Sequence, residues 1–166
     1  MTKQESIVLY NNLQRLATLK GAKFAYAISK NSAILKSEIE ALEKAVQPSE
    51  EFIKLDEKRV ALAKECAKKN EKGEPETIVQ NGVSSYVMED DKVFEEKFKA
   101  LKEEDKEIWE AREKQIKEYN ELLKTESTVQ LYKLSKSDIP NDITVGQMNS
   151  IYELIEEDIP SPYPPK

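Results

Sequence analysis

Acidic stretches are the first residues in this sequence that could do chemistry. The stretches 103–105 and 156–158 each read Glu-Glu-Asp. Acid–base hydrolysis needs two carboxyls that a cleft holds apart with different pKa values. Consecutive carboxylates on a helix point in different directions instead, which is typical of a solvated surface. The stretch 89–91, Glu-Asp-Asp, offers oxygen ligands to a divalent cation, but it lacks the twelve-residue calcium-loop pattern and is better explained as a helix cap.

Nucleophiles and phosphate-binding loops are the next candidates, and the sequence offers few. It contains no histidine and a single cysteine, Cys66, which excludes a Cys/His zinc finger, a histidine-based triad and a disulfide framework. Cys66 has no histidine to deprotonate it. The four glycines are isolated, so no glycine-rich phosphate loop exists. We therefore expect no enzymatic activity, no catalytic residue, no metal and no cofactor.

Aromatic residues beside lysines are the better candidates for binding. Phe24 and Tyr26 lie near Lys20, Lys23 and Lys30, a combination that stacks on bases or rings. The alternative, which we favour, is that the two aromatics pack the head of the fold against the helical stalk. The chain has 26 basic and 32 acidic residues, a net charge of −6, which argues against general binding to phosphate backbones. The basic face of residues 20–36 keeps a nucleic-acid-associated factor as the alternative function. The full set of candidate interaction residues is Lys20, Lys23, Phe24, Tyr26, Lys30, Trp109 and Tyr119.

The elements that position these residues are mostly helices. An N-terminal helix is expected over 1–21, ending at Gly21. A first coil arm follows over 22–70, in which two rows of apolar residues repeat every seven positions, as in a coiled-coil seam. One row is Ile28, Leu35 and Leu42; the other is Ile39, Val46, Ile53 and Val60. Pro48 interrupts the arm, either as a kink or as a break after which Ser49 caps a second helix, and we favour the break near 48.

The middle of the chain combines a hairpin signal with a second helical pattern. Asn81-Gly82 between two apolar runs predicts a β-hairpin over 74–89. A second coil arm over 90–125 begins with a cap at Asp90 or Asp91. Its apolar row is interrupted by polar residues, and it is shorter than the first arm, so we expect either a homo-oligomer or a first arm folded back at Pro48. The interrupting residues are Asp105, Arg112 and Gln115.

The C-terminal part completes the predicted fold. Residues 127–157 are expected to form a strand, at 128–134, plus a short helix opened by a capping box of Thr144 and Gln147. That strand is expected to join the hairpin as a third strand. A Pro-rich tail occupies 158–166. No apolar run approaches the roughly 20 residues that cross a bilayer, and the N-terminus lacks a signal peptide, so we expect a cytoplasmic protein without a membrane partner.

The order of these segments carries a resemblance. It runs from the motif at 16–21, Leu-Ala-Thr-Leu-Lys-Gly, through 24–31, Phe-Ala-Tyr-Ala-Ile-Ser-Lys-Asn, and the turn at 70–75. It closes with 129–134, Val-Gln-Leu-Tyr-Lys-Leu, and the pattern at 139–156. This order resembles a family of small helical proteins of unassigned function encoded by tailed bacteriophages and prophages. The resemblance implies a viral origin, a place in the host cytoplasm or the virion, and no catalytic residues.

The sequence thus predicts a mostly α (α+β) fold in a single domain over 1–157. Its centre is an antiparallel coiled-coil helical hairpin with a small β-hairpin or β-sheet head and short terminal helices. The expected function is that of a phage or prophage accessory protein that contacts a protein partner, or itself, through its helices. Self-assembly, a virion component, and an inhibitor of a host protein or defence complex are the three forms considered.

Overall fold

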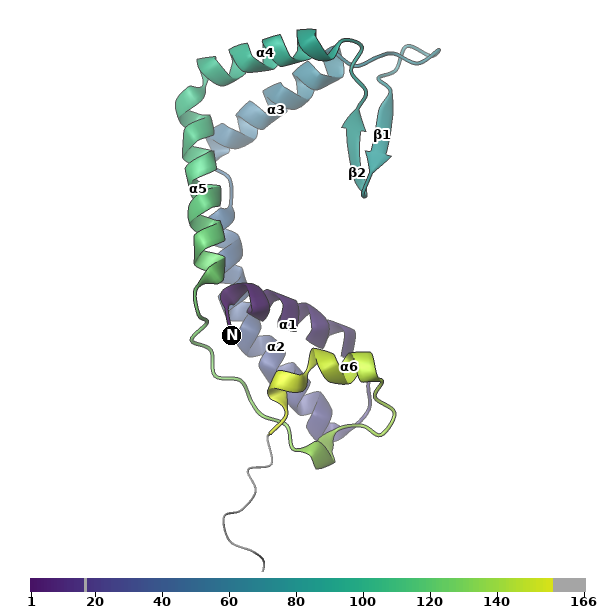
Figure 1. The fold of residues 1–166 in the computed structure, drawn as a ribbon, viewed down its shortest axis with the longest axis vertical. Helices are drawn as coiled ribbons and strands as arrows, with labels where there is room; N and C mark the ends of the chain where they lie inside the picture. The colour runs from purple at the N-terminus through teal and green to yellow at the C-terminus, as the bar shows by residue number, and fades with distance from the viewer. Residues whose placement is uncertain (17, 157–166) are drawn as a thin grey trace, which may run out of the picture. The chain divides into compact units, whose positions relative to one another are not determined.

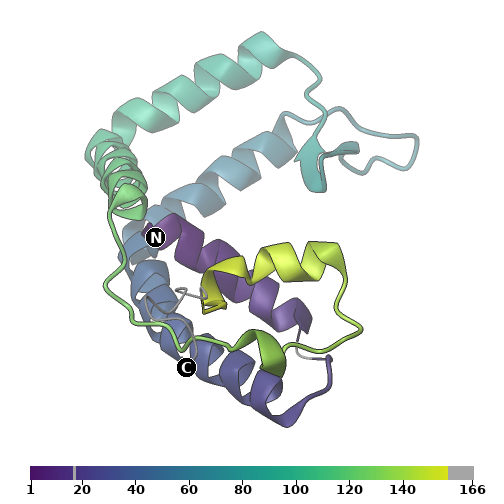
Figure 2. The same cartoon turned by 60° about the horizontal axis from the view of Figure 1, so that its bottom comes forward.

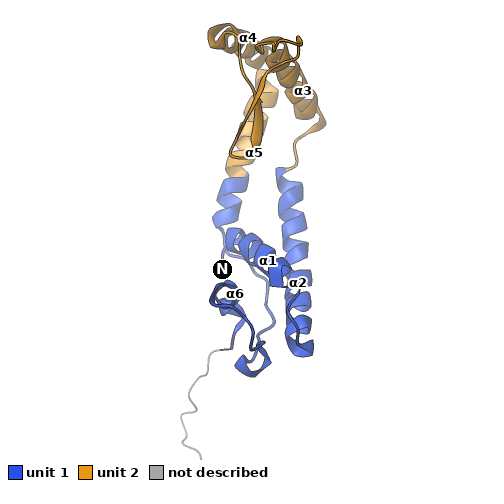
Figure 3. Cartoon of the chain, turned by 90° about the vertical axis from the view of Figure 1, so that its right-hand side faces the viewer, with its two compact units in different colours: residues 1–46, 119–166 blue, residues 47–118 orange. Residues whose placement is uncertain are grey.

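The computed structural model describes residues 1–16 and 18–156 and is mostly helical, with one small antiparallel sheet (Figure 1). Contacts gather the chain into two compact units: unit 1 comprises residues 1–46 and 119–166, and unit 2 comprises residues 47–118 (Figure 3). That both fold together as one domain over 1–157 stays a prediction. No helix among the described residues is long and apolar enough to cross a membrane. The predicted Pro-rich tail lies outside the described residues.

Unit 1 is built on two packed helices, α1 (Lys3–Leu16) and α2 (Ala22–Val46). Each presents an apolar stripe at helical spacing, and the stripes bury each other. The predicted row of Ile28, Leu35 and Leu42 is buried here. A third layer comes from the C-terminal part, where α6 (Val145–Ser150) contacts α1, as Figures 1 and 2 both show. The core is therefore closed by segments far apart in sequence.

The junction between α1 and α2 differs from the prediction. We expected Gly21 to end the first helix, but α1 ends at Leu16, and Gly21 instead directly precedes α2. The Gly21 carbonyl accepts a hydrogen bond from the Ala25 N–H at 2.8 Å, as the residue before a helix does. The φ of Gly21 is +126°, which residues with a side chain rarely adopt. The position therefore favours glycine at the start of α2 for the same reason that it would at the end of a helix.

The predicted strand over 128–134 is wrong, and the reason is a buried side chain. Asn31, fully buried on α2, donates from Nδ2 to the Tyr132 carbonyl at 2.9 Å and accepts from the Tyr132 N–H at 2.7 Å. A side chain thus takes the hydrogen bonds that a neighbouring strand would have supplied. Leu134 makes only an isolated bridge to Ile155, and the described sheet has two strands rather than three.

The segment instead runs along α2 in the opposite direction. Its contacts with α2 fall in reverse order: Ser127 bonds Glu38, Tyr132 bonds Asn31, and Asp138 pairs with Lys23. Two 3₁₀ turns follow it, η1 (Lys136–Asp138) and η2 (Tyr152–Leu154), on either side of α6. The predicted capping box of Thr144 and Gln147 at the start of α6 is confirmed.

Unit 2 begins where the predicted break occurs. The helix α3 (Glu50–Glu65) is capped by Ser49, whose hydroxyl accepts from the Phe52 N–H at 3.2 Å. The break near 48 is thereby confirmed, because Pro48 cannot continue α2 and Ser49 supplies a start. The helix ends at Glu65, with Cys66 at its C-cap, rather than near residue 70.

The second arm is not continuous. Asp90 caps α4 (Asp91–Glu104) as predicted, accepting from the Lys92 and Val93 N–H groups. A break at Asp105 then separates α4 from α5 (Lys106–Lys124), which belongs to unit 2 as far as residue 118 (Figure 1). Asp105 has non-helical backbone angles, φ −111° and ψ 35°, and its carbonyl accepts from the first turn of α5. The expectation of one arm over 90–125 is corrected accordingly.

Two ion pairs show the relative direction of α3 and α4, the two helices that pack together in unit 2. The Lys97 ammonium on α4 lies 2.8 Å from the Glu65 carboxylate at the end of α3. Lys58 lies about two turns before Glu65 on α3, and its ammonium is 3.0 Å from the Asp105 carboxylate at the end of α4. The pairing runs in opposite order along the two helices, so α3 and α4 are antiparallel. The predicted antiparallel helical pair is present in this part, over much shorter helices than expected.

The predicted hairpin is confirmed between these helices. Strands β1 (Thr77–Gln80) and β2 (Val83–Tyr86) pair in antiparallel register, with Gln80 opposite Val83. The turn residues Asn81 and Gly82 both have positive φ, 51° and 78°, as a two-residue hairpin turn of this kind requires. At its base the hairpin is joined by Lys68, whose N–H donates to the Val87 carbonyl and whose carbonyl accepts from Glu76.

Candidate interaction surfaces

The predicted interaction residues do not form one site. Phe24 is fully buried and packs in the core of unit 1, so it is not available to a partner. This corrects the assignment of Phe24, which falls on the stripe of α2 that faces α1; the packing alternative does not hold for Tyr26, which is 57% exposed. Tyr119 is partly buried on α5 in unit 1, and Trp109 lies in unit 2.

Tyr26 and Lys30 do come together, with a residue that the sequence did not indicate. The Tyr26 and Tyr132 rings meet edge to face, with centroids 5.7 Å apart and an interplanar angle of 89°. The Lys30 ammonium lies 4.6 Å from the Tyr132 centroid and 5.7 Å from that of Tyr26. The result is an exposed aromatic patch with one cation on it. Tyr132 lies about a hundred residues away in sequence, and Asn31 holds its backbone on α2, so no local pattern indicated it.

Carboxylates reduce the basic character of the strip around this patch. Lys23 is 3.1 Å from Asp138, and Lys36 is 3.7 Å from Glu40. Lys20 is exposed just before α2. Neighbouring carboxylates compete with phosphate for these ammonium groups, so the local field is weaker than the count of lysines predicts.

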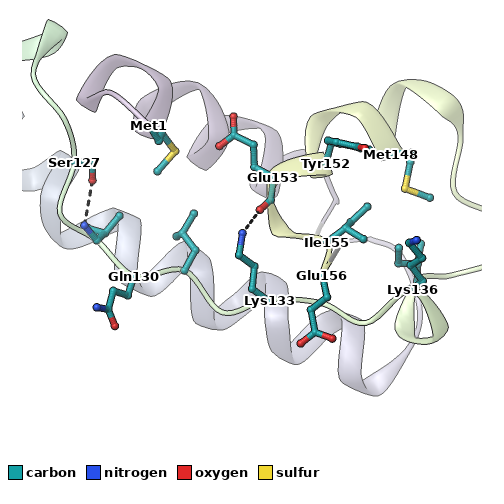
Figure 4. Close-up of a pocket in the computed structure, with 13 residues that line it drawn as sticks. Met1, Ser127, Gln130, Lys133, Lys136, Met148, Tyr152, Glu153, Ile155 and Glu156 are labelled. Atoms are coloured by element: carbon teal, nitrogen blue, oxygen red, sulfur yellow. Dashed lines mark hydrogen bonds between the residues drawn. The ribbon is translucent and has the colours of Figure 1, made fainter. Parts of the chain in front are cut away.

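A groove of about 1520 Å³ lies in unit 1 between the extended segment and the turns around α6 (Figure 4). Its wall is mainly apolar, with Leu131, Met148 and Ile155 among the lining residues. The Lys133 ammonium donates to the Glu153 carbonyl at 2.6 Å, midway along the labelled lining residues (Figure 4). The lining mixes both signs of charge and brings no titratable groups together in a way that indicates catalysis.

Trp109 joins the three helices of unit 2. Its ring meets Phe52 of α3 at 5.3 Å and Phe98 of α4 at 5.7 Å, both edge to face. The Lys102 ammonium lies 5.1 Å from the indole and the Arg112 guanidinium 5.4 Å from the Phe52 ring. Within the described residues, the buried Nε1 of Trp109 has no hydrogen-bond partner.

The residues of the second seven-residue row, which runs from Ile39 to Val60, differ in burial. Ile39, on α2, is buried with 9% of its surface exposed, whereas Ile53 and Val60 on α3 are 46% and 40% exposed. The break at residues 47–49 divides the row between unit 1, where Ile39 is buried, and unit 2, where the described residues cover Ile53 and Val60 only in part. Ile53 and Val60 therefore form a partly exposed apolar pair, two turns apart on one helix, which we call the α3 row.

Electrostatic shifts in unit 2 come from its two interhelical ion pairs. The Lys97 ammonium holds the pKa of Glu65 below its usual value, and Glu65 in turn raises the pKa of Lys97. The hydrogen bond to Asp105 likewise raises the pKa of Lys58. At the start of α3, the backbone N–H and the Ser49 hydroxyl lower the pKa of Glu51. Glu65, Lys97 and Lys58 are exposed, so each pair contributes little to stability.

The described residues contain no group of three side chains able to hold a metal ion, and Cys66 is a free, partly buried thiol. No protein family, curated protein or solved structure matches the chain. The interpretation of its surfaces therefore depends on their geometry and composition.

Proposed function

We propose that this protein acts by binding protein, itself or a partner, through the helices of unit 2, as an accessory protein of the phage or prophage kind that the resemblance implies. The observation that supports it most is the α3 row. Ile53 and Val60 repeat at the spacing of a coiled-coil seam, yet nearly half of each side chain is exposed. Fully burying an exposed side chain of this size contributes about 1.5–3 kcal/mol; less than half of each remains exposed here, so covering it contributes about 1 kcal/mol, and an amphipathic helix laid on this row gains from two such anchors.

Charges around the row would select its partner. Glu57 and Lys64 flank it on α3, and such flanking charges set the partner and direction in coiled coils. Residues 73–166 carry 12 basic and 22 acidic side chains, a net charge of −10, which would steer a basic partner. A coiled-coil contact at the α3 row is thus the finer form of the proposal.

Self-assembly is the form that the purified chain itself can test. Light scattering coupled to size exclusion should give a mass of two or more chains, which falls when Ile53→Glu and Val60→Glu are combined. Val8→Glu is the matched control, because Val8 is 55% exposed on a helix of unit 1. A wild-type mass of two chains that the double variant leaves unchanged would contradict a role for the α3 row.

Virion and host-directed roles would use the same surface and differ in where the protein is found. A virion component remains in purified particles in fixed copy number. An inhibitor of a host protein or defence complex is absent from particles and co-purifies with that host protein. Loss of either association in the Ile53→Glu/Val60→Glu variant, and not in Val8→Glu, is the expected result.

The Tyr26–Tyr132 patch supports a second candidate function, binding of single-stranded nucleic acid. Exposed aromatic rings beside a lysine stack on bases without regard to sequence. Fluorescence anisotropy with a labelled oligonucleotide should then show binding that weakens with salt and with Tyr26→Ala or Lys30→Glu. Equal binding by the wild type and both variants would reject the patch as a site.

A further inference from the structure

We propose that the exposed edge of β1 pairs with β1 of a second copy of this chain. The product is a four-stranded antiparallel sheet in the order β2, β1, partner's β1, partner's β2. The two-fold axis of this contact passes beside Ile78. This surface is separate from the α3 row, so the proposal goes beyond the proposed function and does not depend on it.

The absence of charge in the hairpin is the first observation that supports this pairing. Residues 77–88 contain no charged side chain, although 35% of the chain is charged and its net charge is −6. Natural proteins usually place lysine or another charge on an open strand edge to prevent pairing with other chains. Two copies of a chain with a net charge of −6 repel each other overall, and this neutral segment adds nothing to that repulsion.

The exposure of the hairpin is the second observation. All four residues of β1 are exposed, and Val79 and Val83 are 68% and 65% exposed. An isolated two-stranded sheet is marginal in water, and independent stability needs three or more strands with a hydrophobic face, or packing against a helix. Pairing two hairpins edge to edge supplies four strands and covers part of the β-branched side chains.

The register identifies the open backbone groups. Gln80 and Val83 flank the two-residue turn as a hydrogen-bonded pair, and hydrogen-bonded and non-bonded pairs alternate along an antiparallel ladder. Thr77 and Val79 therefore direct their N–H and C=O groups outward on the β1 edge. The corresponding residues on the β2 edge are Ser84 and Tyr86.

Strand preference favours the β1 edge over the β2 edge. The centre of β1 reads Thr-Ile-Val, and the centre of β2 reads Ser-Ser. β-Branched residues fit a pleated sheet and make favourable cross-strand pairs, which serine does to a smaller extent. The edge of β1 is thus the better template for another strand.

Symmetry then fixes which residues meet. When Thr77 of each copy pairs with Val79 of the other, the outward N–H and C=O groups of both copies are satisfied and the two Ile78 side chains lie opposite each other. Gln80 falls opposite the second copy's Glu76. That carboxylate lies 3.6 Å from the Lys68 ammonium in its own chain, so its charge is partly compensated.

A charge-exchange experiment tests the axis directly. It uses the full chain with Ile53→Glu and Val60→Glu present throughout, so that association through the α3 row is not scored. In this background we expect a two-chain mass by light scattering, lost in Ile78→Lys and in Ile78→Glu because like charges then face each other. An equal mixture of the two variants should restore it, because only a contact of Ile78 with its own copy brings opposite charges together.

The matched control is Ser85→Lys, since Ser85 is the cross-strand partner of Ile78 on β2 and lies on the same face. It should keep the two-chain mass. A one-chain mass in the background protein overturns the proposal. A two-chain mass that survives both Ile78 variants, or that the mixture fails to restore, overturns it as well.

Disulfide trapping gives an independent readout that does not require loss of the contact. With Cys66→Ser to remove the native thiol, Ile78→Cys should form a covalent dimer under mild oxidation. Val83→Cys, on the same face but on β2 and more exposed, should remain largely monomeric. Equal cross-linking of the two variants, or none in Ile78→Cys, overturns the two-fold pairing at β1.

Discussion

Unit 1 and unit 2 use similar amphipathic helices and reach different degrees of burial. Unit 1 closes a core of eleven buried residues from α1, α2 and the C-terminal part, including Leu13, Phe24 and Leu35 with no exposed surface. In unit 2, the buried apolar residues among those described are Leu55, Ala63 and Ala67, and neither α4 nor α5 contains a buried residue. An apolar row becomes core only when a third segment covers it.

The covering segment of unit 1 is held by polar contacts as well as apolar ones. Leu134, Ile151 and Leu154 bring apolar surface to α1 and α2, while Asn31 holds the intervening backbone. Unit 2 has the aromatic contacts of Trp109 and two exposed ion pairs in the same role. Exposed ion pairs stabilise a fold far less than buried apolar area does, so unit 2 is the part of the chain that gains most from a partner.

The largest expected effect is the difference in free energy of unfolding between two leucine-to-alanine variants, one in each unit. Leu13→Ala in unit 1 should lower the free energy of unfolding by about 2–5 kcal/mol, because the cavity opens in a closed core. Leu62→Ala on α3, where the leucine is only partly buried, should cost about 1 kcal/mol. Urea unfolding followed by circular dichroism measures both. Equal losses would mean that the two units are equally well packed.

The next largest loss in free energy of unfolding is expected when Asn31, which holds the backbone of Tyr132 in unit 1, is replaced. Asn31→Ala leaves the N–H and C=O of Tyr132 without their partner, and we expect a loss of about 2–3 kcal/mol in the free energy of unfolding. Asn11→Ala, at an exposed position of α1, is the control and should change it by less than about 0.5 kcal/mol. Faster amide exchange in residues 127–134 of the Asn31 variant alone would locate the effect.

A helix cap tests unit 2 at a smaller scale. Asp90→Ala removes an acceptor for the Lys92 and Val93 N–H groups and should cost about 1 kcal/mol. Hydrogen exchange should accelerate in the first turn of α4 while α1 and α2 keep their protection. Glu95→Ala, exposed on the same helix, serves as the control, and an equal change in both variants would count against the cap.

The smallest expected effect is the acid dependence of the Glu65–Lys97 pair. Because the folded pKa of Glu65 lies below its usual value of 4.5, the pair stabilises unit 2 above that pH and the contribution disappears as pH falls through the folded pKa. Lys97, with a raised pKa, keeps its charge throughout that window. In Lys97→Met, the free energy of unfolding measured with urea should therefore fall less steeply as the pH is lowered than in the wild type. The same dependence on pH in both proteins would show that the pair contributes nothing.

Local signals in the sequence predicted the parts of this fold that local interactions decide. The Asn81-Gly82 turn, the Ser49 and Asp90 caps and the capping box at Thr144 each involve hydrogen bonds within a few residues. The prediction of a strand at 128–134 was wrong because the backbone conformation there depends on hydrogen bonds with Asn31, about a hundred residues away. The break at Asp105 was marked only as a polar interruption, since nothing nearby distinguishes it from a surface position.

The interaction residues divide in the same way. The aromatic and lysine residues at 20–30 were identified from neighbouring positions, but exposure decides which of them can act, and exposure depends on the whole fold. Tyr26 and Lys30 face outward and Phe24 faces the core, although all three lie within two turns of one helix. The sequence predicted the hairpin and a third strand, at 128–134, beside it; because that strand does not form, the open edge of the hairpin became visible only in the structure.

The place of Trp109 has a practical consequence for following the molecule in solution. It is the only tryptophan in the chain, and it contacts α3 and α4 within unit 2. Selective excitation of indole fluorescence therefore reports unit 2 alone, while circular dichroism averages over both units. Emission from this natural probe that changes at lower urea than the dichroism would resolve the order in which the two units lose structure, without any attached dye.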